Sequence, residues 1–364
     1  MRRVRLKFGG TSLPALISPF PRKLACGLAV LLACSWPLPA VAQTKTPAKK
    51  PAATAKSSKT TVKRSTRTSL ARAAAARRAR QAALARQQRE AMTPHYKTDA
   101  FGNIVPDVRA AAAIVYNPQT GDVLWENNAH DQRSIASLTK IMTAVTFIAD
   151  DPDLTQKVTV TRPDVTRAST THLMAGEVVS LDDLLHLTLI ASDNAAARVL
   201  ARTSEGGTKA FVQRMNEMAT HLGLTNTHYE DPSGLDARNV SSAYDISHLI
   251  AFATSDDRLG PIMRTAQFDV ETSRRDFTIH STNKLLGTDV DVVGGKTGFI
   301  SKAGYCLATL LQVPQGSQVA VVVLGAANSA VRFWETRHLF DWAVGRTQGL
   351  FAATPATSAA PATP

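Results

Sequence analysis

The sequence predicts an α+β fold whose antiparallel sheet is made from both ends of the folded part of the chain. Strand patterns open this part at residues 111–125 and dominate it again over residues 268–324. Helical patterns fill the middle, over residues 134–252, and an amphipathic pattern over residues 327–344 closes it. Strands on either side of a helical block are typical of an α+β layout rather than of alternating βαβ units.

Charge is distributed very unevenly along the 364 residues. Residues 1–43 carry a net charge of +6 and residues 44–92 carry +13, so the remainder carries −6 of the total of +13. The chain is long enough for one large or two medium domains, and its folded part is mildly acidic. This balance argues against a basic nucleic-acid-binding fold, and no nucleic-acid partner is expected.

Residues 1–42 have the pattern of a secretory signal peptide. A basic segment ends at Lys23, an apolar run covers residues 24–36, and Ala40-Val41-Ala42 follows as a cleavage site. Cleavage after Ala42 and export are therefore expected. The lipoprotein-like box that ends at Cys34 is the alternative, but the prolines behind it suit ordinary cleavage better. No later run is long and apolar enough to be predicted to span a bilayer.

The basic stretch over residues 43–95 is predicted to be a low-complexity tether. It has few large apolar side chains, so burial cannot offset the entropy of ordering it, although residues 69–92 have the composition of a marginal helix. A solvated tether and an electrostatic contact with an anionic envelope surface are the two interpretations. The folded domain is expected over residues 96–346, and the Ala/Pro/Thr-rich residues 347–364 form a predicted disordered tail.

The first elements of the domain follow from apolar patterns and turn residues. Residues 111–116 and 122–125 alternate around a polar turn and predict a hairpin. Ser134 is the expected N-cap of the next helix, where apolar side chains recur at helical spacing through Ala149. Residues 158–161 have a short strand pattern.

Capping signals and alternation predict the later elements. Ser180 and Ser242 each precede an Asp by three residues, which is a helix N-terminus pattern. The predicted helices cover residues 180–190, 194–202, 209–222 and 242–252, with a turn at 231–234 between the last two. The predicted strands cover residues 268–272, 277–280, 290–297, 305–313 and 318–324, with a hairpin turn at Gln315-Gly316, and a helix over 327–344 closes the domain.

Ser137 and Lys140 are the first candidate site residues. They are one helical turn apart, so they share a face, and Lys140 is the one ionisable residue from Ser137 to Ala149. Burial disfavours the charged form of a lysine and makes it a candidate base for a serine hydroxyl, which is otherwise a poor nucleophile. Ser-x-x-Lys also occurs by chance, and a lone helical lysine commonly lies at the surface, so further motifs must decide.

Two later motifs supply the partners. Ser192-Asp193-Asn194 lies between two predicted helices, where it could also serve merely as an N-cap. Gly294-Gly295-Lys296-Thr297-Gly298 precedes a strand pattern. It is not a phosphate-binding loop, because Val290 stands where that motif needs glycine and no helix is predicted to follow.

Ser-x-x-Lys, Ser-Asp-Asn and Lys-Thr-Gly in this order are far more specific together than any one of them. With residues 134–143, 231–235 and 303–306 around them, they make the chain resemble the low-molecular-mass penicillin-binding proteins, in the D-alanyl-D-alanine endopeptidase branch. The resemblance covers residues 100–345. It implies a penicillin-binding-protein/β-lactamase-like transpeptidase fold, with helices on both faces of the sheet plus a helical block, and a periplasmic location. Related carboxypeptidases usually add a C-terminal domain where this chain has a short tail, which favours the endopeptidase type.

The resemblance also implies roles for individual residues. Ser137 would attack the carbonyl of a D-alanyl residue while Lys140 accepts its proton. Ser192 would relay a proton to the leaving amine, and Asn194 would hold Lys140 and the substrate amide. Asp193 is expected to be structural.

The third motif is implied to bind substrate. Lys296 would keep the pocket positive, and Thr297 would bind the carboxylate next to the scissile bond. The backbone N–H groups of Ser137 and Phe299 would form the oxyanion hole. Gly298 and the two glycines before Lys296 would leave room for a substrate strand at the sheet edge.

The predicted function is therefore an exported serine D,D-peptidase that acts on peptidoglycan peptide stems. It would cut D-alanyl-diaminopimelate cross-links, with terminal D-Ala-D-Ala as the second candidate bond, and β-lactams would acylate Ser137. A class A β-lactamase is one alternative, but it needs a Glu-x-x-x-Asn loop, and Glu230 is followed by Asp231-Pro232-Ser233-Gly234. A non-catalytic wall-binding protein is the other.

Other chemistries have little support in the sequence. No His-Glu-x-x-His run or Cys/His cluster indicates a metal site, and no cofactor is expected. No Gly-x-Ser-x-Gly elbow indicates a Ser-His-Asp hydrolase. After signal cleavage Cys306 is the one remaining cysteine, so no internal disulfide is expected, and its apolar strand pattern predicts burial.

Overall fold

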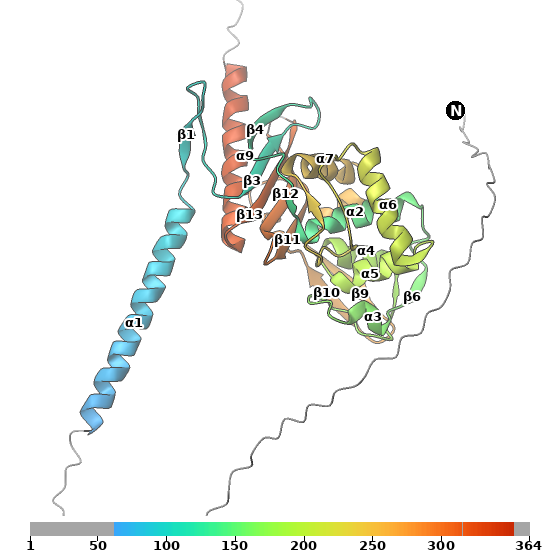
Figure 1. Ribbon diagram of the computed structural model, residues 1–364, viewed down its shortest axis with the longest axis horizontal. Helices are drawn as coiled ribbons and strands as arrows, with labels where there is room; N and C mark the ends of the chain where they lie inside the picture. Colours follow the sequence, from blue (N-terminus) through green and yellow to red (C-terminus); the bar gives the residue numbers. More distant parts are fainter. Residues whose placement is uncertain (1–61, 315, 353–364) are drawn as a thin grey trace, which may run out of the picture. The chain divides into compact units, whose positions relative to one another are not determined.

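The computed structural model describes residues 62–314 and 316–352 (Figure 1). The predicted signal peptide, the Cys34 box, the start of the tether, Gln315 and the end of the tail lie outside the described residues. The chain divides into the units Met1–Arg67 and Thr68–Pro364. Within the predicted tether, α1 (Val62–Ala91) is a continuous helix, longer than the sequence pattern suggested. Among the described helices, none combines the length and hydropathy needed to cross a membrane.

The central sheet joins both ends of the domain, as predicted. Within the described part of the chain its strand order is β11-β12-β13-β3-β4, with every neighbouring pair antiparallel. The strands are β3 (Ala112–Tyr116), β4 (Val123–Asn127), β11 (Val292–Ile300), β12 (Gly304–Gln312) and β13 (Gln318–Ala326). The hairpin β3–β4 confirms the pattern at residues 111–125. Strand β11 lies at an edge of the sheet, which places the Lys-Thr-Gly motif there.

Alternation along the strands gives the sheet two buried faces. In β13, Ala320, Val322 and Leu324 belong to the core that contains α7 (Ala243–Thr254). Their neighbours Val319, Val321 and Val323 belong to the core that contains α9 (Ser329–Ala352). Figure 1 shows the sheet between α9 and the helical block. The period-two pattern of a strand therefore accounts for helices on both faces.

The helical block carries the Ser-x-x-Lys and Ser-Asp-Asn motifs. Its elements are α2 (Thr139–Ala149), α3 (Arg162–Val165), α4 (Leu181–Leu189), α5 (Asn194–Thr203), α6 (Gly207–His221), α7 and α8 (Leu259–Met263). The predicted caps are confirmed, because the hydroxyls of Ser180 and Ser242 accept hydrogen bonds from the backbone N–H groups of Asp183 and Asp245. Phe211 and Met215 of α6 are buried.

Short two-stranded sheets surround this framework. They are β1 (Tyr96–Thr98) with β2 (Ile104–Pro106), β5 (Arg133–Ser134) with β8 (Val240–Ser241), β6 (Lys157–Thr159) with β7 (Val178–Ser180), and β9 (Gln267–Glu271) with β10 (Asp276–His280). The sequence missed most of these pieces and the helices α3 and α8, because two to five residues carry little periodic signal.

Two boundary predictions were wrong. Ser134 does not cap the first helix, because it pairs with Val240 in a strand and α2 begins after the 3₁₀ turn Ala136–Leu138. Helix α9 continues to Ala352 instead of ending at residue 344, so part of the predicted disordered tail is helical.

Candidate active site

The nucleophile candidate Ser137 lies in a tight turn rather than in the helix itself. The turn Ala136–Leu138 precedes α2, and Ala136 has a left-handed backbone with φ of 49°. Gly234, also left-handed, packs against this turn so closely that a Cβ there would lie 2.1 Å from the carbonyl oxygen of Ala136. Backbone strain of this kind commonly collects at functional sites, and here it holds the half-buried hydroxyl of Ser137 at the end of the helix.

Lys140 is fully buried below Ser137 and makes three short contacts. Its Nζ lies 3.1 Å from Ser137 Oγ, 2.5 Å from Asn194 Oδ1 and 2.5 Å from the carbonyl oxygen of Ser233. Burial lowers the pKa of Lys140 to about 7, against the opposing charges of Asp193 and Asp231.

The neutral form of this amine has a geometry suited to a base. A neutral amine has two N–H groups and one lone pair, and neither Asn194 Oδ1 nor the Ser233 carbonyl can donate a hydrogen bond. These two oxygens therefore accept the two N–H groups and leave the lone pair for the hydroxyl of Ser137. This arrangement is that of an activated nucleophile.

The Ser-Asp-Asn motif supports the lysine from the start of α5. Asp193 caps the helix through a bond from Ala196 N to its Oδ1, and Asn194 Nδ2 donates to the carbonyl oxygen of Ala168. Ser192 has a left-handed φ of 59°, and its hydroxyl accepts a 2.7 Å bond from Lys296 Nζ. The structure thus joins the second motif to the first through Asn194 and to the third through Ser192.

Strand β11 brings the Lys-Thr-Gly motif to the same place. Lys296 is buried, and its pKa is lowered by burial and by the positive charges of Lys140 and Arg332. A substrate carboxylate nearby would oppose this shift and favour the charged form. The hydroxyl of Thr297 donates to Thr282 Oγ1 at 2.6 Å.

The glycines of this motif serve the protein's own packing. A Cβ on Gly298 would lie 2.9 Å from the carbonyl oxygen of Ile135, so glycine allows β11 to approach the Ser137 turn. A Cβ on Gly294 or Gly295 would meet Thr254 or Asn283. These contacts explain why glycine stands at each position, and the predicted role of the glycines, room for a substrate strand at the sheet edge, stays a prediction.

All eight predicted site residues lie at or directly beneath one cleft of about 450 Å³. The lining residues are Ser137, Ser169, Thr170, Ala191, Ser192, Asn194, Leu235, Thr282, Thr297, Gly298, Phe299, Ile300, Ser301 and Arg332. None of them is a carboxylate. Phe299 is 48% exposed at its rim and stacks on Tyr305 with 4.2 Å between ring centroids. Hydroxyls, an aromatic ring and the guanidinium of Arg332 suit a peptide that carries a carboxylate.

The sequence missed three contributors to this site. The Ser233 carbonyl has no side-chain signature, although its turn was predicted. Thr282 had no motif around it. Arg332 comes from α9, and its guanidinium donates to the carbonyl oxygens of Gly298 and Cys306. A single arginine in an amphipathic helix carries no signal of such a role. Cys306 is buried in β12, as predicted.

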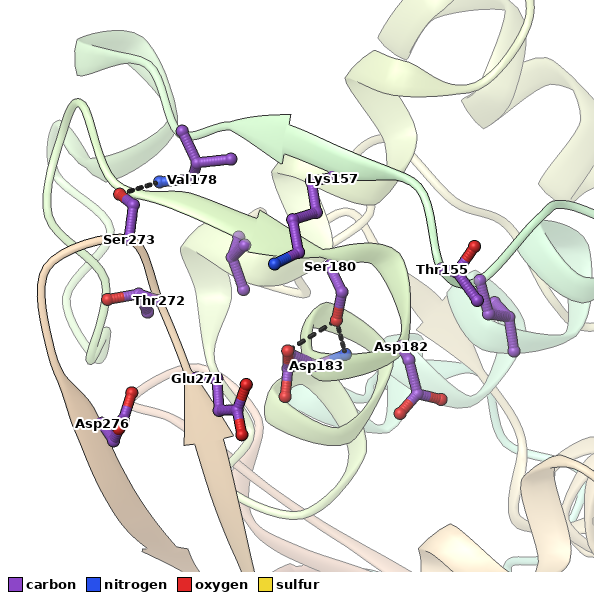
Figure 2. A pocket seen from close by; sticks show the side chains of 12 residues that line it. Thr155, Lys157, Val178, Ser180, Asp182, Asp183, Glu271, Thr272, Ser273 and Asp276 are labelled. Carbon is purple, nitrogen blue, oxygen red and sulfur yellow. Dashed lines mark hydrogen bonds between the residues drawn. The ribbon is translucent and has the colours of Figure 1, made fainter.

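A second pocket, of about 540 Å³, has the opposite chemical character (Figure 2). It lies between β6, β7, the start of α4 and the β9–β10 hairpin, and Asp182, Asp183, Glu271 and Asp276 are among its lining residues. One of its two serines, Ser180, donates to Asp183 Oδ2 and accepts from Asp183 N, so this hydroxyl is committed to the helix cap.

Neither a metal site nor a β-lactamase glutamate is found among the described residues. No group of three or more His, Cys, Asp and Glu side chains in this part of the chain could hold a metal ion. The exposed Glu230 contacts His228 Nε2 at 3.2 Å and does not line the cleft. The β-lactamase alternative therefore lacks its deacylating residue at the position considered.

Comparison with known proteins agrees with this geometry. The family model described as D-alanyl-D-alanine carboxypeptidase matches residues 99–328. The D-alanyl-D-alanine endopeptidases of Escherichia coli and Pseudomonas aeruginosa are 30% and 31% identical to the chain, over 65% of it and 78% and 77% of their own lengths. The crystal structure of a Streptomyces DD-transpeptidase matches with a TM-score of 0.63 and 28% identity, over 66% of this chain and 98% of that one.

Proposed function

The chain belongs to the D-alanyl-D-alanine carboxypeptidase family of serine peptidases, and from that premise we propose that it hydrolyses D-alanyl-diaminopimelate cross-links in peptidoglycan. Terminal D-Ala-D-Ala is the second candidate bond. The observation that carries the proposal is the contact between the buried Nζ of Lys140 and the hydroxyl of Ser137. The similarity to two endopeptidases supports the cross-link as the preferred substrate.

Acylation of Ser137 would proceed in two steps. Ser137 Oγ attacks the D-alanyl carbonyl carbon while its proton passes to the neutral Nζ of Lys140. The tetrahedral oxyanion is bound by the backbone N–H groups of Ser137 and Phe299, a contact that typically contributes about 10²–10³ in rate. The C–N bond then breaks, and the proton that Lys140 accepted passes to the leaving amine through the hydroxyl of Ser192, which contacts Lys296, so that Lys140 is neutral again. An ester on Ser137 remains.

Hydrolysis of the ester would complete the cycle. A water molecule loses a proton to the again neutral Lys140 and attacks the ester carbonyl, and Ser137 recovers its proton as the acid leaves. Thr297 would bind the carboxylate next to the scissile bond, and a lining that contains Arg332 and no carboxylate favours such an anionic group. A β-lactam would follow the same first step, and its ring opening would leave a stable acyl-enzyme.

The test is a direct assay of purified protein. Wild type should release monomers from cross-linked muropeptide dimers and take up one fluorescent penicillin covalently, and Ser137→Ala should do neither. A parallel digest of pentapeptide monomers ranks the two candidate bonds. Residual covalent labelling of Ser137→Ala would contradict the assignment, and rapid turnover of a chromogenic cephalosporin would favour a β-lactamase.

We further propose that the protein is exported to the periplasm through residues 1–42 and that residues 43–92 bind an anionic envelope surface. The net charge of +13 over residues 44–92 motivates the second proposal. Retention on isolated walls or anionic vesicles should fall as salt rises and should be lost on deletion of residues 43–92. Equal retention of the deleted protein would reject the contact.

A further inference from the structure

The capping carboxylate Asp193 has a partner outside the residues considered so far. Its Oδ2 accepts hydrogen bonds from the backbone N of His172, at 2.5 Å, and faces His172 Nδ1 at 3.2 Å. Asp193 is fully buried, whereas the His172 side chain is 41% exposed. Asp193 caps α5 at Asn194, and Asn194 Oδ1 accepts a 2.5 Å hydrogen bond from Lys140 Nζ. The negative charge of Asp193 also raises the pKa of that amine against the effect of burial. His172 is therefore connected to the base through Asp193 and Asn194.

The surrounding segment holds the imidazole in place. Its ring stacks on Phe277 of β10, with 6.0 Å between centroids and 10° between planes. The Arg275 guanidinium lies over the ring of Phe277, 4.5 Å from its centroid, and donates to the carbonyl oxygen of His172. Arg275 is anchored in turn by Glu177 Oε1 at 3.0 Å. The stack on Phe277 and the hydrogen bonds of the His172 backbone thus hold the imidazole in place next to Asp193.

We propose that His172 is a positioning residue of the peptidase, which holds the Asp193 carboxylate in place beside the contact between Asn194 and Lys140. The proposal rests on the proposed function. The charged groups that face His172 are Asp193, Arg275 and, through Arg275, Glu177. Those that act on Lys140 besides Asp193 are Asp231, Arg198 and Lys296. Asp193 thus links the two sets.

The expected effect follows from the charge balance. When His172 is replaced by Ala, Asp193 loses a donor, so its negative charge acts more fully on Lys140 and the pKa of Lys140 rises. The acid limb of the pH profile for acylation should then move up by half to one pH unit. Below that limb, acylation should be roughly 3- to 10-fold slower than in wild type.

A matched control is available on α4. His186 stacks on Phe268 with 3.8 Å between centroids and lies 3.5 Å from the carboxylate of Asp182, which is 45% exposed and lines the acidic pocket. His186→Ala removes the same chemical group from the same kind of stack without touching Asp193. His172→Asn is the conservative variant, because its amide can donate from about the position of Nδ1.

The experiment measures the second-order rate of penicillin acylation against pH, with the full-length protein, together with the melting temperature of each variant. The acid limb should move in His172→Ala, return towards wild type in His172→Asn and stay in place in His186→Ala. Superimposable profiles for wild type and His172→Ala, or an equal shift in His186→Ala, would overturn the inference. A wild type that is not labelled at any pH would instead defeat the proposed function.

Discussion

The catalytic cleft and the acidic pocket each contain a serine and a lysine, and the comparison shows what makes a serine reactive. In the cleft, Lys140 is fully buried and its Nζ contacts the hydroxyl of Ser137. In the acidic pocket, Lys157 is exposed and Ser180 is bound to Asp183 as donor and acceptor. The acidic pocket is the larger one. The size of a pocket and the types of residue in it therefore do not identify a reactive serine. Burial of the amine and a hydroxyl that is not bound in a helix cap do.

The carboxylates sharpen this difference. Asp182, Asp183, Glu271 and Asp276 line the acidic pocket together with Lys157. The residues that line the cleft include no carboxylate. Asp193 and Asp231 act on Lys140 without lining the cleft, and Asp193 is fully buried whereas Asp231 is half-buried. An amine with a pKa near 7 and a surface that binds anions can thus coexist in the cleft.

The largest effect on the rate of acylation is expected when the lysine of each pocket is replaced. Lys140→Ala removes the proton acceptor of Ser137, so the rate of penicillin acylation should fall by about 10²–10⁴-fold. Lys157→Ala should leave that rate unchanged, because Lys157 lines the acidic pocket and is not among the residues that line the cleft. Stopped-flow labelling of both variants checks the prediction. A loss of less than fivefold in Lys140→Ala would show that another group accepts the proton.

The next effect is a pH dependence that belongs to the cleft. Because the folded pKa of Lys140 is about 7, the neutral amine is a minor form at pH 6 and the major form at pH 8. Acylation should therefore rise about tenfold per unit as pH increases towards 7 and level off above it. A lysine with the ordinary pKa of about 10.4 would give a rise that continues past pH 9. Labelling rates from pH 5 to pH 9.5 distinguish the two cases.

Much of the fold could be predicted, because it depends on local patterns. The hairpin β3–β4, the caps Ser180 and Ser242 and the strands β11 to β13 carry alternation or capping signals within a few residues. The three motifs also placed the candidate residues in one cleft, since their order and context are specific.

The remainder depends on contacts between distant segments. The 3₁₀ turn at Ser137 forms where Gly234 packs on Ala136, and no pattern near Ser134 signals that contact. Arg332 reaches the cleft from the closing helix, and His172 reaches Asp193 from a loop. Such residues act through the fold, so a single sequence gives them no periodicity, cap or motif by which they could be found.

The smallest effect is expected when Ser180 is replaced, and it distinguishes a serine that stabilises the fold from one that reacts. Ser180→Ala removes an N-cap, which typically costs about 1 kcal/mol of the free energy of unfolding, while acylation should keep its wild-type rate. Ser137→Ala should show the reverse, because Ser137 caps no helix by a side-chain bond and its loss abolishes labelling. Thermal unfolding and penicillin labelling of both variants provide the check. If Ser180→Ala lowered the rate of acylation as well as the stability, the two pockets would be coupled. The contrast between a structural and a reactive serine would then no longer hold.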